Sequence, residues 1–513
     1  MNFNKTSVLH TFLFAIFPII HLYSINLIEV TLVEIFLPLL VSVLLTGIFL
    51  VILKLISKDW IKSGLIVSLM LILTFSYGHL YDWINSEISE EIGRHSILLP
   101  IFSIVLLVGS VLFIKTKIKL DNFKTIVNVI AITLIIITIP NFVFAGVDIS
   151  ETSDELIFSN FQINYEIENI TSIQQEKPDV YYVLLDGYGG TKNMLKDLNY
   201  DNYEFLSELS NRGFFAPDSS SSNYPTTGWQ MTSIFSMNYV PIKEKEQSDM
   251  EYQSIITNIL HQNEVMRNFH DLDYKIIQYQ PNGFVKQEYR YVDQTFCKEK
   301  VSNNSKFGIT LLRTSILSYL NYLIEIDNKR DSLLCGFSEI SKLKDNETSP
   351  IFVYMHLAIP HPPYVFDSNG DSIIGGKAQT EEKSFVNKQQ YIDSIKFSNK
   401  KTLQFIDNIL EDNKKSIIII QSDHGYDFGI DFQNPSEIHL KQRFSNLNAI
   451  LLPEHDDLLY EGMTPVNTFR IIFDEYFDTS YGIIDDKMYY HPYEVTTRYK
   501  DVDFKDITSI IRD

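Results

Sequence analysis

The chain has 513 residues, with 43 Lys and Arg against 64 Asp and Glu, and its formal net charge is −21. Its charged part holds no run of basic residues, so the composition argues against nucleic acid as a partner and is typical of an acidic, soluble surface. Apolar residues concentrate in 1–147 and most of the charge lies in 150–513. We therefore predict a membrane domain over 1–149, followed by a water-soluble part.

Five apolar stretches make up the predicted membrane domain, near residues 7–27, 32–56, 63–81, 97–114 and 125–147. Most of them are long enough to cross about 30 Å of hydrocarbon as helices. The first stretch could be read as a signal peptide, since Lys5 precedes it. However, no small-residue cleavage site follows it, and four more stretches come after. We interpret it as a retained helix, which gives about five transmembrane helices.

The loops between these stretches differ in charge. Eight lysines share one side, namely Lys5, Lys54, Lys58, Lys62, Lys115, Lys117, Lys119 and Lys124. The other side holds Arg94 as its only Lys or Arg. Positive loops stay in the cytoplasm, so five spans place residues 150–513 outside; an even number of spans would reverse this orientation.

The soluble part begins with a polar, irregular linker over 150–177, and 178–513 reads as one folded domain. Strand-like apolar runs alternate there with helix-like segments, among them 192–212 and 308–326, which predicts an α/β domain with helices on both faces of a sheet. Two cysteines, Cys297 and Cys335, lie in this part. They could form a disulfide in an oxidising compartment, or remain two thiols.

Polar residues follow two of the predicted strands directly. The run 180–185 ends at Asp186, and the run 416–421 leads to Asp423 and His424. Binding sites in open α/β sheets gather at the carboxyl ends of strands, and oxygen and nitrogen ligands of this kind suit zinc or manganese. Asp186 with Gly187 could also be an ordinary turn, but two strand ends with metal-type groups favour a metal site.

A hydroxyl-rich loop precedes a predicted helix that starts near Thr226 and Thr227. A threonine there is a natural helix N-cap. The same geometry suits catalysis, because free N–H groups at a helix N-terminus bind phosphate, and a nearby metal activates a hydroxyl as a nucleophile. A third strand, 350–357, leads to His361 in a proline-rich turn. A lone histidine of this kind is more often structural, and we assign His356, inside the strand, to packing.

The order of these motifs resembles a known superfamily. PDVYYVLLDG is similar to the opening strand of alkaline phosphatases and sulfatases, SNYPTTGWQMTSIFSM to their nucleophile segment, and SDHG to their late metal ligands. HLAIPHPPYVF resembles a segment of bacterial membrane-bound sulfatase-like proteins. A multi-span anchor with an external domain is similar to the architecture of lipoteichoic acid synthases and lipid A phosphoethanolamine transferases.

The resemblance implies a metal site with four ligands: Asp186, Thr227, Asp423 and His424. Thr227 matches the nucleophile, with Thr226 as the near alternative. His361 matches a histidine that contacts the substrate or leaving group. His439 lies where transferase relatives carry a further active-site histidine, for the substrate or a second metal; it can equally be a plain surface residue.

Two departures from the sulfatase pattern narrow the expected chemistry. Sulfatases convert a Cys or Ser to formylglycine, whereas Thr227 stands here and no Arg follows at the family spacing. Asp186 is a single carboxylate where sulfatases have two, which leaves one metal. We therefore expect an enzyme of the bacterial cytoplasmic membrane that transfers or hydrolyses phosphoryl groups on a lipid-linked or glycan substrate through a phospho-threonine. The alternatives are a sulfatase-type ester hydrolase and a catalytically silent envelope protein that binds a glycan or assembles a synthesis complex.

Overall fold

The computed structural model describes residues 8–26, 32–87, 94–141, 177–280, 289–297, 306–344, 347–373, 387–412, 415–493 and 499–512. The linker predicted over 150–177 lies almost wholly outside these residues. The chain forms two compact units. The helical unit comprises Met1–Tyr165 and Val301–Ile324, and the α/β unit comprises Glu166–Lys300 and Glu325–Asp513.

Among the described residues of the helical unit, five apolar helices come first in the chain: α1 (Leu9–Ser24), α2 (Leu32–Ser57), α3 (Trp60–Glu87), α4 (His95–Lys115) and α5 (Asp121–Ile137). By length and hydropathy, α2 to α5 can each cross a membrane, and α1 is shorter. At 16 residues it spans about 24 Å. Its Phe14 and Ala15 pack with residues of α2, α3 and α5, so α1 lies inside the bundle.

Helices α1 and α5 run in the same direction. The backbone N–H of His10 donates to Asn128 Oδ1 at 2.8 Å, and Asn141 Nδ2 donates to Ser24 Oγ at 3.1 Å. Residue number therefore increases along both helices together. In a bundle whose successive helices alternate in direction, two helices that run the same way are an even number of helices apart in the chain, as α1 and α5 are.

The α/β unit is built on a six-stranded sheet in the order β3-β2-β4-β1-β5-β6. Its strands are β1 (Val180–Leu185), β2 (Lys275–Tyr279), β3 (Gln294–Phe296), β4 (Ile351–Leu357), β5 (Ile417–Gln421) and β6 (Asn448–Leu451). All neighbours pair in parallel except β5 and β6. Every residue of β1, β4 and β5 is buried, because helices cover both faces of the sheet. The α/β fold class predicted from the sequence is confirmed.

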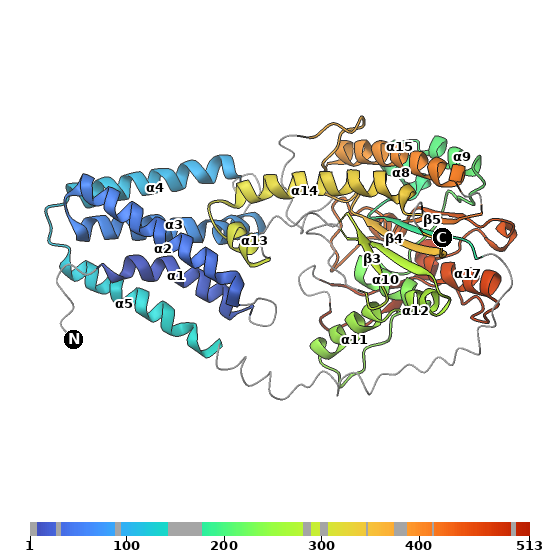
Figure 1. The fold of residues 1–513 in the computed structure, drawn as a ribbon, viewed down its shortest axis with the longest axis horizontal. Coiled ribbons are helices and arrows are strands. Elements are labelled where there is room, and N and C mark those ends of the chain that lie inside the picture. Colours follow the sequence, from blue (N-terminus) through green and yellow to red (C-terminus); the bar gives the residue numbers. More distant parts are fainter. Residues whose placement is uncertain are drawn as a thin grey trace. The chain divides into compact units, whose positions relative to one another are not determined.

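The helices of this unit lie in two layers (Figure 1). On one face α10 (Thr227–Ser236), α12 (Glu264–Asp271) and α17 (Thr468–Phe477) pack on the sheet. The other face carries α8 (Thr191–Leu198), α9 (Tyr203–Ser210), α15 (Lys388–Asp412) and the later residues of α14 (Ser318–Glu339). Further elements among the described residues of this unit are the helices α11 (Asp249–His261), α16 (Glu437–Phe444) and α18 (Thr508–Arg512), the 3-10 helices η1 (Ile340–Lys342), η3 (Asp456–Leu458) and η4 (Pro465–Asn467), and a ribbon of β7 (Tyr489–Tyr490) and β8 (Lys505–Asp506). Helix α13 (Lys306–Arg313) belongs to the helical unit.

Three differences from the sequence analysis concern helix breaks and the path of the chain. The helix predicted over 192–212 is two helices, because Asn199 ends α8 in a left-handed conformation. The helix predicted over 308–326 is divided between α13 and α14. The sequence analysis assigned 178–513 to one domain, whereas Val301–Ile324 pack with the helical unit. In the α/β unit Cys297 and Cys335 form a disulfide that joins β3 to α14, with their Cα atoms 5.8 Å apart.

Candidate active site

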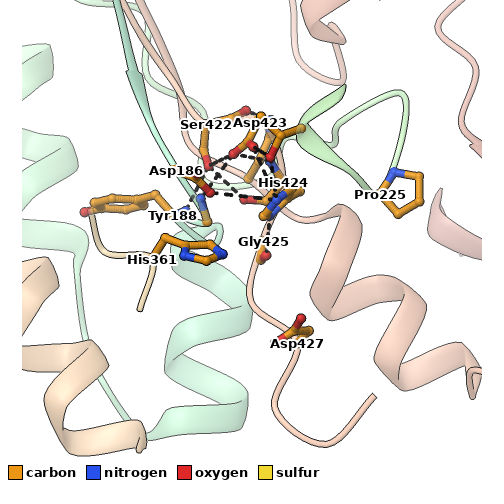
Figure 2. Close-up of polar contacts among 12 residues, drawn as sticks. Asp186, Tyr188, Pro225, His361, Ser422, Asp423, His424, Gly425 and Asp427 are labelled. Atoms are coloured by element: carbon orange, nitrogen blue, oxygen red, sulfur yellow. Dashed lines mark hydrogen bonds and ion pairs between the residues drawn. The ribbon is translucent and has the colours of Figure 1, made fainter. Parts of the chain in front are cut away.

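The topology brings the two acidic strand ends together. Strands β1 and β5 are parallel neighbours in the centre of the sheet, with Leu184 opposite Gln421. Asp186 follows β1, and Asp423 and His424 follow β5. One ligand atom from each of these three buried residues lies within 4.8 Å of the others. Figure 2 shows the three side chains converging at this edge of the sheet.

Asp186 is held by histidine on the neighbouring strand. His356 is the second-to-last residue of β4, and its Nε2 lies 3.2 Å from Asp186 Oδ2. Asp186 Oδ1 is buried and has no hydrogen-bond partner among the described residues. Burial alone would raise the pKa of Asp186, but the charge of His361 and the hydrogen bond from His356 bring it well below its usual range. Asp186 is therefore a carboxylate with one oxygen left for a cation.

Asp423 is oriented by the backbone. Its Oδ1 accepts from the N–H groups of Gly187 at 3.1 Å and His424 at 3.0 Å. Gly187 has φ 74, a conformation that favours glycine and lets the turn after β1 reach this carboxylate. Asp423 Oδ2 thereby points to the Thr227 hydroxyl.

His424 is held in the form that binds metal. Its Nδ1 lies 2.9 Å from the carbonyl oxygen of Gly425, so Nδ1 carries the hydrogen and Nε2 keeps a lone pair. Burial, with the nearby Arg443 charge, lowers the pKa of His424 below 6.5. His424 Nε2 lies 3.3 Å from Asp423 Oδ2 and 3.8 Å from Asp186 Oδ1.

These residues fit a divalent metal. Ligands at zinc distances of 2.0–2.2 Å in a tetrahedral site are about 3.4 Å apart, close to the separations found here. Two carboxylates and one neutral imidazole also match the charge of such an ion. Asp186 Oδ1, buried with no hydrogen bond, is the atom that a cation would satisfy.

Of the two threonines, the structure brings Thr227 to this cluster. Its Oγ1 donates to Asp423 Oδ2 at 2.6 Å and lies 3.4 Å from His424 Nε2. Thr227 is the first residue of α10. Thr226 is the N-cap, with its hydroxyl buried and without a hydrogen-bond partner among the described residues. The N-cap position therefore belongs to Thr226, and the hydroxyl of Thr227 faces the metal-type residues.

His361 lies on the Asp186 side of the cluster (Figure 2). Its backbone N–H donates to the carbonyl oxygen of Asp186 at 3.0 Å, and its Nδ1 lies 2.7 Å from the carbonyl oxygen of Pro362. Lys329 of α14 stabilises this turn, because its Nζ donates to the carbonyl oxygens of His361 at 2.7 Å and Pro363 at 3.0 Å. Burial lowers the pKa of Lys329 to about 7.

Arg443, at the end of α16, ties two loops of the site together. Its Nε donates to the carbonyl oxygen of Pro225 at 2.7 Å, next to the two threonines. Its Nη1 donates to the carbonyl oxygen of Gly425 at 3.3 Å and pairs with Asp427 at 3.4 Å. Both side chains of this ion pair are buried, with 7% and 8% exposed. The guanidinium therefore links the segment before Thr227 to the segment after His424.

His439 is placed differently. It lies on α16, where its backbone N–H donates to Oγ of Ser436, the N-cap residue, at 3.3 Å. The metal-type group formed by the described residues contains Asp186, Asp423 and His424 and does not include His439. A place for His439 in substrate or second-metal binding stays a prediction.

Sequence reasoning missed three residues of the site. His356 was assigned to packing, and its contact with Asp186 depends on the pairing of β1 with β4. Lys329 and Arg443 gave no motif signal, because each acts on backbone carbonyls far away in the sequence. The one available signal was that Lys329 and Arg443 each stand at a position of the helix where an apolar residue is expected, which indicates a buried charge.

Comparison with known proteins identifies the family. The sequence model of the sulfatase family matches residues 178–471, more than half of the chain. No curated protein matches the chain. Among solved structures, the zinc complex of the C-terminal periplasmic domain of EcEptC from Escherichia coli is similar at 10% identity and a TM-score of 0.39, with 64% of this chain and 94% of that one covered.

Two further solved structures show similarity of the same degree. The integral membrane lipooligosaccharide phosphoethanolamine transferase A (EptA) from Neisseria meningitidis is 12% identical at a TM-score of 0.39, with 96% of this chain and 97% of that one covered. A protein in the alkaline phosphatase superfamily from Vibrio parahaemolyticus is 12% identical at a TM-score of 0.39, covering 62% and 74%. The family match spans Asp186, Thr227, Asp423 and His424, and the chain belongs to the sulfatase family.

Proposed function

We propose that this protein is a membrane-anchored phosphotransferase or phosphohydrolase that depends on a divalent metal, zinc or manganese, and forms a phospho-threonine at Thr227. One observation carries the proposal: Thr227 Oγ1 lies 2.6 Å from Asp423 Oδ2 and 3.4 Å from His424 Nε2. A hydroxyl in contact with two metal-type ligands, at the first residue of a helix, is suited to attack phosphorus.

The residues of the chain divide the reaction between them. Asp186, Asp423 and His424 would hold the metal, which when bound lowers the pKa of a neighbouring hydroxyl and offsets charge on the phosphoryl oxygens. Thr227 Oγ1 forms a bond to phosphorus as the bond from phosphorus to the leaving oxygen breaks. The hydroxyl proton leaves to solvent as the hydroxyl gives up its hydrogen bond to Asp423 Oδ2, so that Oδ2 stays the carboxylate oxygen that would hold the metal. In this proposal His361 protonates the leaving oxygen.

The second half of the reaction restores the threonine. A water or an acceptor hydroxyl attacks the phosphorus and gives its proton to His361, and the bond from phosphorus to Thr227 Oγ1 breaks as that oxygen takes a proton from solvent. Thr226 makes no side-chain hydrogen bond to the first turn of α10, which leaves the positive end of the helix for phosphoryl oxygens. Water as acceptor gives a hydrolase, and a lipid or glycan hydroxyl gives a transferase.

A location outside the cytoplasm, on five spans, is part of the same proposal. The parallel α1 and α5 fit an alternating bundle in which both helices cross in the same direction. Lys62, near the start of α3, donates to the carbonyls of Ile114 and Thr116 at the end of α4, so two lysine-rich loops share one end of the bundle. The disulfide in the α/β unit favours an oxidising compartment. An anchor in the bilayer makes a lipid-linked or cell-envelope phosphoester the natural substrate.

Sulfate esters are the second candidate substrate, since the chain belongs to the sulfatase family. Threonine cannot be converted to formylglycine, so Thr227 favours phosphorus. The discriminating assay compares matched phosphate and sulfate esters with the full-length protein in detergent. Faster turnover of the sulfate ester would refute the phosphoryl preference.

The nucleophile is tested by comparing two adjacent variants. Thr227→Ala should abolish turnover while the protein remains folded, and Thr226→Ala should retain most of it. Mass spectrometry of wild-type protein quenched during turnover should find the phosphoryl group on Thr227. Full activity of Thr227→Ala would refute the mechanism. Chelation should also remove activity, and added zinc or manganese should restore it.

A further inference from the structure

The chain leaves the α/β unit and returns to it in the middle of its sequence. The α/β unit is interrupted after Lys300 and resumes at Glu325, and Val301–Ile324 pack with the helical unit. We call residues 306–318 the docking segment; it contains α13 and the turn that precedes α14. The two units are therefore joined by three passages of the chain.

One end of the docking segment is held by apolar packing. Phe307 of α13 is 1% exposed and packs with Ile19 and Tyr23 of α1 and Ile35 of α2. Leu311, one turn further along α13, contacts the same cluster. Phe307 thus fills a space among the transmembrane helices, as a core residue does in a folded domain.

The other end is held by the backbone of α3. The N–H of Gly78 donates to the carbonyl oxygen of Thr314 at 3.1 Å, and the N–H of Ile316 donates to the carbonyl oxygen of Thr74 at 2.8 Å. The carbonyl of Thr74 and the N–H of Gly78 lie four residues apart, so they mark the two ends of one turn of α3. Both ends of that turn are thus bonded to the docking segment.

Gly78 is the residue that permits this approach. A Cβ atom at Gly78 would lie 2.4 Å from the carbonyl oxygen of Arg313 and 2.6 Å from Thr314 C. Both are backbone atoms, so no side-chain rotation can relieve the overlap. Gly47 of α2 gives the contrast, since a Cβ there meets no atom within 4 Å.

We propose that the docking segment is a second attachment of the α/β unit to the membrane domain, and that it supports action on substrates embedded in the bilayer. The inference rests on the proposed function. The rate at which a bilayer substrate reaches the active site depends on its effective concentration at that site. Attachment of the α/β unit to the membrane domain raises this concentration. A substrate in solution gains nothing from attachment. Undocking should therefore lower turnover of membrane substrates alone.

The test uses the full-length protein with two probes. One is bis(p-nitrophenyl) phosphate in solution, and the other is fluorescent phosphatidylethanolamine or phosphatidylglycerol in phosphatidylcholine vesicles. Gly78→Leu disrupts the backbone contact of the docking segment with α3, and Phe307→Ser removes its apolar packing on α1 and α2, so the two variants test the two ends of the segment independently. Gly47→Leu and Leu317→Ser, at an exposed residue of the same segment, are the matched controls. Trypsin cleavage after Arg313 reports docking without reference to activity.

We expect both docking variants to lose at least about tenfold on the vesicle probe, to stay within about twofold of wild type on the soluble probe, and to be cut faster after Arg313. Equal loss on both probes, or loss on neither, overturns the inference. Unchanged cleavage of both variants overturns it as well. Failure of the proposed function looks different, since wild type and Thr227→Ala would then act alike on both probes.

Discussion

Replacing Arg443 with Met separates two roles of one guanidinium. The side chain donates to the carbonyl oxygen of Pro225 at 2.7 Å and pairs with Asp427 at 3.4 Å, where both partners are buried. Removing one partner of a buried ion pair typically costs about 3–5 kcal/mol, because the other charge remains in a poorly solvated place. Loss of the Pro225 contact acts instead on the loop that precedes Thr227.

The two effects differ in magnitude and in rescue. We expect Arg443→Met to lower the thermal midpoint of the α/β unit by roughly 10 °C. A hydrogen bond from a charged donor contributes about 1.5–3 kcal/mol, so kcat/KM should fall about 10- to 100-fold if that hold is needed in the transition state. Adding Asp427→Asn should restore most of the stability, because no buried carboxylate is then left without its guanidinium.

The double variant decides between these roles, because Asp427→Asn does not replace the contact with Pro225. Activity should therefore stay low while the thermal midpoint recovers, measured by thermal shift and by phosphoester turnover. Arg212→Met is the control, since its partners Glu208 and Asp407 are 45% and 55% exposed and such a pair contributes less than about 1 kcal/mol. Recovery of turnover together with stability in the double variant would refute the positioning role.

Three further predictions concern other parts of the site. Lys329→Met removes two hydrogen bonds to the turn that holds His361 and should lower kcat about tenfold, as measured by steady-state turnover; unchanged kcat would remove Lys329 from the site. Gly425→Ala should prevent stable folding, as seen by thermal shift, because its Cβ would lie 2.1 Å from the carbonyl oxygen of Gln442. Burial and the Arg443 charge lower the pKa of His424, so its neutral form persists to more acidic pH than that of an exposed histidine and is lost only as pH falls further. Zinc affinity measured by titration should therefore decline only towards acidic pH, and a decline towards alkaline pH would contradict this.

The part of the site that the sequence predicts is the part carried by strand ends. Asp186, Asp423 and His424 follow buried apolar runs directly, and parallel strands bring their carboxyl ends to one edge of a sheet. Their proximity could therefore be expected before the strand order was known. The choice between Thr226 and Thr227 could not be made, since a shift of one residue at a helix start changes which hydroxyl faces the site.

The rest depends on contacts between distant segments. The contact of His356 with Asp186 needs the order of the strands, and the hold of Lys329 on the turn at His361 needs the packing of α14. The docking segment was read as an ordinary helix of the soluble domain, because α13 is amphipathic and too short to cross a bilayer. Local periodicity reports that a helix has an apolar face, and does not report which unit that face contacts.

The central pairing of β1 with β5 has a consequence for biosynthesis. Gly187 and Asp423, which touch in the folded protein, are 236 residues apart in the chain. A ribosome that adds residues from the N-terminus completes the first half of the site long before the second. The group of Asp186, Asp423 and His424 is therefore incomplete through most of synthesis, and all three side chains can hold a metal together only after β5 has joined the sheet.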